Sequence, residues 1–159
     1  TESKAWIESI TEKPCTMFCY PYGDHSAETA NLVRQAGFRG ARTVQPWKFD
    51  VDDAYRIPTS LHIYPFPFRP ILSRRILDPV RNAYSTLRSS HVSLWQMRGW
   101  LPMAKVLFTY ALREHKSFFH LWGHSWEVEK YGMWGELEKF LKYVSAQENV
   151  AYSTNSALI

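Results

Sequence analysis

Hydrophobic residues recur every three to four positions along several stretches of the chain, which is the spacing of an amphipathic helix. The first stretch stops near Pro14, and the second begins after Ser26, a plausible N-cap, and ends at Gly37. A later stretch has Pro102 in its first turn, where a helix tolerates proline. The predicted helices are Glu2–Glu12, Ser26–Ala36, Asp78–Ser89, Leu101–His115 (stripe Val106, Leu107, Tyr110, Ala111) and one with its stripe at Trp134, Leu137, Phe140, Leu141 and Val144.

Shorter apolar runs alternate with these helices and predict strands. A strand, a helix and a further strand make the repeating unit of a parallel sheet, so the fold class is predicted to be α/β with mostly parallel strands. Residues 45–58, rich in Asp and Pro, predict a long loop, and residues 65–70 predict an extended surface segment or a lid. The predicted strands are Cys15–Tyr20, Gly40–Val44, Thr59–Tyr64, Ser117–Trp122 and Val150–Tyr152.

The composition is that of an ordinary globular protein, 45% hydrophobic and 21% charged, and predicts a single domain over residues 1–159. The net charge of +4 is spread out, with no basic run longer than Arg74-Arg75, so no nucleic-acid partner is expected. No apolar stretch reaches membrane-spanning length, so no membrane segment is predicted in this chain.

The only two cysteines, Cys15 and Cys19, fall in one predicted strand. At about 3.3 Å per residue they would lie about 13 Å apart, beyond the reach of a disulfide. We expect two free, mostly buried thiols, which leaves the cellular compartment open.

Candidate chemistry lies where two predicted strands end. Residues 18–23 read Phe-Cys-Tyr-Pro-Tyr-Gly, and residues 121–127 read Leu-Trp-Gly-His-Ser-Trp-Glu. Parallel strands present functional groups at their carboxyl ends, so Tyr22 and His124 are expected to face the same rim. An imidazole there can donate a proton to a leaving group near neutral pH, and a hydrogen bond that merely holds a loop is the alternative.

The pair His120 and His124 has the spacing of a metal clamp if it lies on a helix. The flanking apolar residues favour a strand instead, which would separate the two rings by about 13 Å, too far for one zinc ion. Glu127 is either an orienting partner of His124 or the first-turn acid of the next helix.

The first corner, followed by a helix and Gly37-Phe38, resembles the third motif of the polysaccharide deacetylases (the NodB-homology family), an aromatic strand that ends in Pro-Tyr-Gly. Residues 121–127 resemble the last motif of one branch of that family. Residues 41–44, Ala-Arg-Thr-Val, and 152–155, Tyr-Ser-Thr-Asn, also resemble that branch. The likeness is weak from about residue 65 to 115.

The resemblance implies a distorted (β/α) barrel and metal-dependent hydrolysis of N-acetyl groups on carbohydrate. A divalent metal, zinc being expected, would activate water, and a backbone N–H would stabilise the oxyanion. Carried over by motif, Tyr22 supplies that N–H and His124 is the general acid. The substrate-binding residues implied are Tyr20, Pro21, Trp122 and Trp126, although either tryptophan can equally be core.

The chain departs from the family pattern in two respects. The usual Arg of the third motif aligns with Cys19. The family's Asp-Asp pair and its His-x-x-x-His metal segment have no match, so the metal ligands are not expected in this chain. We therefore expect the C-terminal portion of a deacetylase domain, inactive without the missing N-terminal part as its partner. The alternative is a non-catalytic carbohydrate-binding remnant of the same fold.

Overall fold

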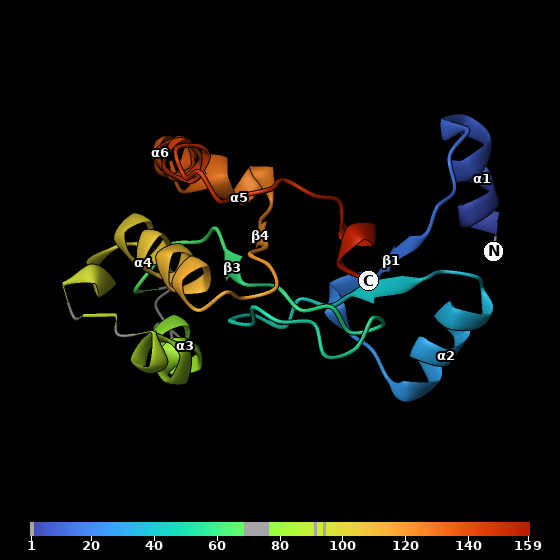
Figure 1. Ribbon diagram of the computed structural model, residues 1–159, viewed down its shortest axis with the longest axis horizontal. Helices are drawn as coiled ribbons and strands as arrows, with labels where there is room; N and C mark the ends of the chain where they lie inside the picture. Colours follow the sequence, from blue (N-terminus) through green and yellow to red (C-terminus); the bar gives the residue numbers. More distant parts are fainter. Residues whose placement is uncertain (1, 69–76, 91, 94) are drawn as a thin grey trace. The chain divides into compact units, whose positions relative to one another are not determined.

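The computed structural model describes residues 2–68, 77–90, 92–93 and 95–159. The chain divides into two compact units, Thr1–Thr59 with Tyr152–Ile159, and Ser60–Ala151 (Figure 1). Both units combine helices with short parallel strands, so the predicted α/β class is confirmed. The expectation of a single domain stays a prediction.

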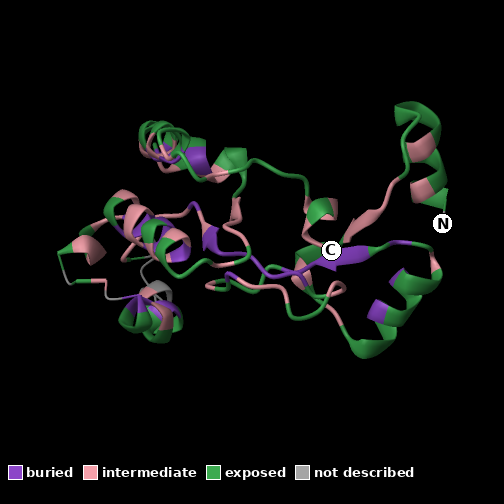
Figure 2. Ribbon diagram, in the orientation of Figure 1, coloured by how far each residue is buried: buried purple, intermediate pink, exposed green. Residues whose placement is uncertain are grey.

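The first unit is built on a strand, a helix and a parallel strand. Strand β1 (Met17–Cys19) pairs in parallel with β2 (Gly40–Arg42), and helix α2 (Ala27–Gln35) connects them. Two of the predicted strands are thus confirmed, in shortened form. Figure 2 shows that β2 is buried along its whole length, whereas α2 buries only one face.

Local chemistry fixes both ends of α2. The Ser26 hydroxyl accepts a hydrogen bond from the Thr29 backbone N–H (3.1 Å), and the Ser26 backbone N–H donates to the Thr29 hydroxyl (2.7 Å), which makes a capping box. At the other end Gly37 has a φ of 76°, and Phe38 N–H donates to Val33 C=O (3.4 Å). This is the glycine-dependent helix ending that the sequence predicts.

Helix α1 (Glu2–Thr11), also predicted, is attached by polar contacts and buries none of its described residues. The Lys4 ammonium donates to Gly37 C=O (2.8 Å) and lies 4.9 Å from the centre of the Phe38 ring. The Glu8 carboxylate accepts from the Cys15 backbone N–H (2.8 Å). The helix therefore leaves its apolar side chains Trp6, Ile7 and Ile10 exposed.

The loop predicted over residues 45–58 contains one strand-like contact. Ile57 forms a parallel bridge with Arg42 and is fully buried. The predicted strand Val150–Tyr152 is wrong, because this segment runs into a short 3-10 helix, η3 (Asn155–Leu158), and not along a sheet edge. The Asn155 side chain accepts a hydrogen bond from the Arg42 guanidinium (2.7 Å), which ties the C-terminal segment to β2.

Both cysteines are free, as predicted. Cys19 is exposed, so the prediction of burial is wrong for this residue. Strand side chains alternate between two faces, and Tyr20 beside it turns into the core, so Cys19 faces outward.

The second unit pairs β3 (Leu61–His62) in parallel with β4 (Leu121–Trp122). The connection between them includes α3 (Asp78–Ser89), η2 (Gln96–Arg98) and α4 (Trp100–Arg113). Helices α5 (Ser125–Lys130) and α6 (Trp134–Ser145) follow β4. The predicted strand Thr59–Tyr64 is confirmed only at its centre and Ser117–Trp122 only at its last two residues. Of the proposed lid, residues 69–70 lie outside the described residues.

The core of this unit lies between α4 and α6, which pack together. Trp100 meets Phe140 edge to face at 5.5 Å between ring centres, and Phe108 meets Phe140 at 6.0 Å. The predicted stripe of α4 is confirmed at Leu107 and Ala111, whereas Val106 and Tyr110 are only half-buried. The residues that α4 buries are Trp100, Met103, Ala104, Leu107, Phe108 and Ala111.

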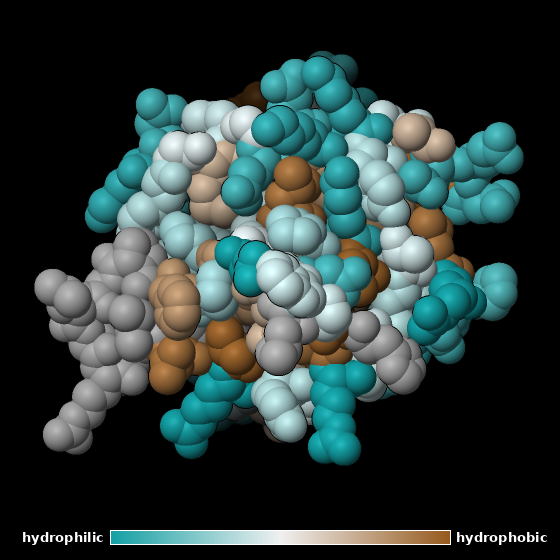
Figure 3. Space-filling view, turned by 90° about the vertical axis from the view of Figure 1, so that its left-hand side faces the viewer, coloured by the Kyte–Doolittle hydropathy of each residue, from teal (hydrophilic) through white to brown (hydrophobic). Residues whose placement is uncertain are grey.

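The α6 stripe is correct at Phe140 and Val144 but wrong at Trp134 and Leu141, which are exposed. Other large apolar side chains of this unit also reach the surface, among them Trp95 and Trp126. The space-filling view shows apolar side chains at several places between polar ones (Figure 3). Among the described residues, no helix has the length and apolar character needed to cross a membrane.

Candidate active site

The first corner turns sharply where β1 ends. Pro21–Gly23 form a 3-10 turn, η1, in which Gly23 N–H donates to Tyr20 C=O (2.8 Å). Gly23 has a φ of 74°, and a Cβ added there would lie 2.3 Å from Val44 Cγ2. Only glycine fits this position, because both the backbone conformation and the close approach of Val44 exclude a side chain.

Tyr22 occupies the tip of this corner in a left-handed conformation with a φ of 57°, a backbone strain that clusters at functional sites. Its side chain is 98% exposed. Its backbone N–H makes no hydrogen bond to any residue that the structure describes. The corner thus presents an available N–H donor at the position to which the family resemblance assigns the oxyanion contact.

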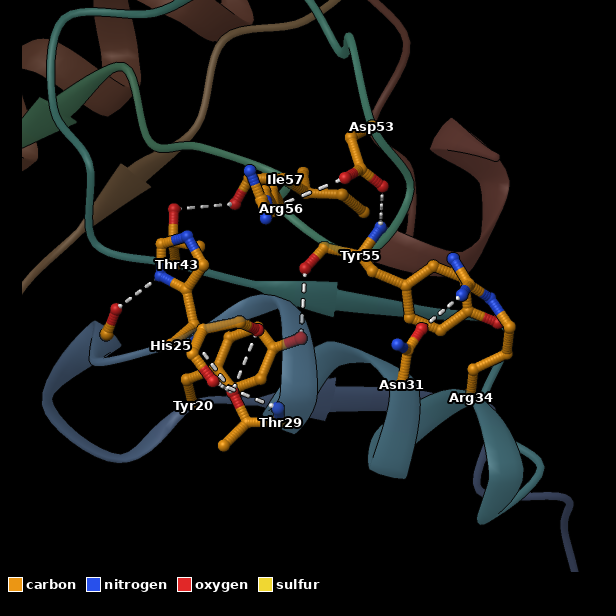
Figure 4. A network of polar contacts seen from close by, with 12 residues as sticks. Tyr20, His25, Thr29, Asn31, Arg34, Thr43, Asp53, Tyr55, Arg56 and Ile57 are labelled. Carbon is orange, nitrogen blue, oxygen red and sulfur yellow. Dashed lines mark hydrogen bonds and ion pairs between the residues drawn. The ribbon is translucent and has the colours of Figure 1, made fainter.

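Tyr20 supports the corner from within the core. Its side chain is only 3% exposed, and its hydroxyl donates to Tyr55 C=O (3.1 Å) (Figure 4). The His25 ring stacks on the Tyr20 ring at 5.4 Å. Burial raises the pKa of Tyr20 above its ordinary value near 10, and the charge of Asp53 adds to this rise. Tyr20 therefore supports the corner from the core, and its buried ring offers no surface for contact with a sugar.

The rest of this network fastens the following loop to α2. The Tyr55 hydroxyl donates to Phe38 C=O (2.8 Å), and the Arg34 guanidinium lies 4.3 Å from the centre of the Tyr55 ring. The Asp53 carboxylate accepts from the Tyr55 backbone N–H (2.8 Å), as Figure 4 shows. Rigid support of this kind is what a backbone donor needs in order to be preorganised.

A positive charge lies on the strand beside Cys19. Cys19 and Arg42 are register partners on β1 and β2, and Arg42 is 5% exposed. The Arg42 guanidinium donates to Pro58 C=O and to Asn155. Burial lowers the pKa of Arg42 to about 10, and the neighbouring Cys19 acts against this shift, so Arg42 stays cationic at neutral pH. The arginine of the family's third motif aligns with Cys19, and the sequence alone did not reveal that Arg42 lies beside Cys19 on the next strand.

The second corner follows β4 in the other unit. Gly123 separates Trp122 from His124, and a Cβ added to Gly123 would lie 2.3 Å from Ile63 Cγ2. His124 C=O accepts hydrogen bonds from Glu127 N–H (2.9 Å) and Val128 N–H (3.1 Å), which start α5. The glycine therefore lets β3 approach, and His124 lies at the exposed junction between strand and helix.

The His124 imidazole is held by rings. It stacks on Trp126 at 5.8 Å with 22° between the planes and meets Trp122 edge to face at 5.4 Å. Neither ring nitrogen hydrogen-bonds to a described residue. The His124 side chain therefore holds no loop by a hydrogen bond within the described residues. Its imidazole remains available for proton transfer.

Glu127 pairs with a histidine that the sequence had not suggested. The His62 Nε2 atom lies 3.2 Å from the Glu127 Oε2 atom, and both side chains are largely buried. The His62 ring stacks almost parallel on Trp122, at 4.2 Å and 11°. Glu127 thus lies in the first turn of α5, which was one of the two predictions for it. The histidine that its carboxylate contacts is His62 and not His124.

The four rings form one array, which we call the ring cluster: His62, Trp122, His124 and Trp126. Trp122 is half-buried within it, and Trp126 is 59% exposed at its edge. Exposed aromatic faces are suitable for stacking against the flat apolar face of a sugar ring. His62 could have been found from the sequence only by its position near the end of a predicted strand, Thr59–Tyr64.

The described residues do not offer a metal site. No group of three or more His, Cys, Asp or Glu side chains in that part of the chain is placed to hold an ion. Tyr22 belongs to the first unit and His124 to the second, so their common rim stays a prediction.

Comparison with known families bears on the first corner. Residues 1–41 match the polysaccharide deacetylase family model. This match includes α1, β1, the Tyr22 corner and α2, so the resemblance predicted there is confirmed. The second corner, at residues 121–127, lies beyond the matched region. No curated protein and no solved structure matches the chain.

Proposed function

We propose that the protein is a metal-dependent hydrolase that removes N-acetyl groups from carbohydrate. The observation that carries the proposal is the deacetylase family match over residues 1–41, which includes a corner with an available backbone N–H. The same proposal gives the whole domain the distorted (β/α) barrel of that family, with these parallel strands as part of it.

In this proposal the Tyr22 N–H donates to the acetyl carbonyl oxygen as that oxygen gains negative charge. A fixed backbone donor stabilises the tetrahedral state without reorganisation, and loss of one such donor elsewhere costs a factor of about 100 to 1,000 in rate. The supporting features are the tight Gly23 contact with Val44 and the buried Tyr20 hydroxyl bond.

The oxygen of a water molecule bonds to the acetyl carbon to form this tetrahedral state, and His124 then donates a proton to the nitrogen of the sugar amine as the C–N bond breaks. The products are acetate and the free amine. The available ring nitrogens support this role, as does the imidazole's exposed place at the end of β4. Trp126 and Trp122 would contact the sugar, and Pro21 lies at the surface beside Tyr22.

The residues described do not fit a catalytic metal, so we derive no step through one. The proposal assigns the metal ligands, zinc being the expected ion, to polypeptide outside the described residues, and the described units alone would not deacetylate. That further polypeptide is then the partner that these units need, with an N-acetylated carbohydrate as substrate.

A second candidate function is sugar binding without catalysis. The exposed ring of Trp126, stacked on His124, favours it, since an aromatic platform binds sugar without any metal.

Acetate release from N-acetylglucosamine oligomers by the purified natural protein distinguishes the two functions. The hydrolase proposal expects release that a chelator abolishes and zinc restores. Sugar binding with no acetate release under any metal condition would refute the hydrolase and leave the binding function.

A further inference from the structure

We propose that His62, paired with Glu127, is a positioning residue for sugar binding: it fixes the ring cluster on which the sugar is held. This inference rests on the proposed function, in either its hydrolytic or its binding form. His62 does not contact the substrate itself in this proposal and acts only through Trp122 and His124.

The geometry places His62 at the centre of the cluster. One face of its ring lies against Trp122, its plane is perpendicular to that of His124 (90°, 6.5 Å between ring centres), and Tyr64 stacks nearby at 5.4 Å. Its backbone C=O accepts a hydrogen bond from the Trp100 indole (2.8 Å), which anchors β3 to the core helix α4. The backbone that carries the ring is therefore anchored to the core, and the neighbouring rings hold the imidazole itself.

Glu127 fixes the remaining freedom of the His62 ring. A stacked ring can still rotate in its plane, but the contact between Nε2 and the Glu127 carboxylate selects one orientation. The Glu127 carboxylate comes from the helix that begins directly after His124. The pair thus links the end of β3 to the start of α5 across the corner that carries His124.

The chemical consequence concerns the plane of Trp122. A sugar ring stacks more tightly on an indole whose plane is already fixed, because ordering a loose ring on binding lowers affinity. The stacked His62 ring and the perpendicular His124 ring together hold Trp122 in one orientation. Loss of the hydrogen bond to the charged Glu127 carboxylate should therefore weaken sugar binding by a factor of about 10.

The test measures the affinity of the 159-residue chain for the N-acetylglucosamine tetramer, by calorimetry. The variants are Glu127→Gln, which keeps the size of the side chain, His62→Ala, and the double variant. Glu129→Gln is the matched control, because Glu129 lies on the same helix and bonds the Trp134 indole (2.6 Å) away from the cluster. Far-UV circular dichroism checks that each variant folds.

We expect each single variant to lose about tenfold in affinity, with the double variant no weaker than His62→Ala, since partners in one pair are not additive. The control should bind like the unaltered chain. Affinities within twofold for Glu127→Gln, additive losses, or no sugar binding by the unaltered chain would each overturn the inference. Acetate release is measured separately, so a protein that binds sugar with this coupling and releases no acetate refutes only the hydrolase.

Discussion

Replacing Gly123 with alanine should destabilise the second unit. The added Cβ would lie 2.3 Å from Ile63 Cγ2, and Ile63 is buried at 3% exposure. A methyl group forced into a packed contact of this kind costs about 1–3 kcal/mol. In a domain of this size that corresponds to a fall in melting temperature of about 2–4 °C per kcal/mol.

The same structure provides a glycine with the opposite expectation. Gly135 lies in α6, and a Cβ added there meets nothing within 4 Å. Gly135→Ala should therefore stabilise the unit by about 0.5–1 kcal/mol, because alanine loses less backbone entropy in a helix.

Urea unfolding of the purified chain, followed by tryptophan fluorescence, measures both effects. A double variant locates the cause: Ile63→Ala alone should cost about 2–5 kcal/mol, and adding Gly123→Ala to it should cost nothing further because the clashing methyl is gone. Equal stability of Gly123→Ala and the unaltered chain, or a full additive loss in the double variant, would refute the proposed contact.

Two further predictions concern the first unit. Ser26→Ala removes the hydroxyl that accepts the Thr29 backbone N–H in the α2 capping box and should lower the free energy of unfolding by about 1 kcal/mol, measured by urea titration, and an unchanged midpoint would contradict the cap. Buried Tyr20 keeps its proton to a higher pH when folded than when unfolded, so its stabilisation is complete below about pH 10 and is lost as the pH rises through its folded pKa. Unfolding free energies at about pH 9 and about pH 11 should thus differ less in Tyr20→Phe than in the unaltered chain, and an equal difference would show that Tyr20 is not responsible.

Local signals predicted the first unit well. The capping residue Ser26 and the terminating Gly37 defined α2, and both act through contacts within a few residues. The Tyr22 corner was also visible, because Pro and Gly mark a sharp turn wherever they follow a strand.

Contacts between distant residues could not be predicted in this way. His62 and Glu127 are 65 residues apart and meet only because β3 pairs with β4. Arg42 likewise bonds Asn155, 113 residues away, at the start of η3, and the strand predicted just before it at Val150–Tyr152 does not form. Strand lengths were overestimated because an apolar run shows that a segment is buried but not how many of its residues pair.

The most direct test of the central claim compares acetate release by the natural protein with release by its His124→Asn variant, on N-acetylglucosamine oligomers. His115→Asn is the control, because His115 is exposed at the end of α4 with a φ of 48°, which asparagine tolerates. If His124 protonates the leaving amine, its variant should lose a factor of about 100 to 10,000 in rate while the control is unaffected. An undiminished rate in His124→Asn would contradict the assignment of the second corner as the source of the proton.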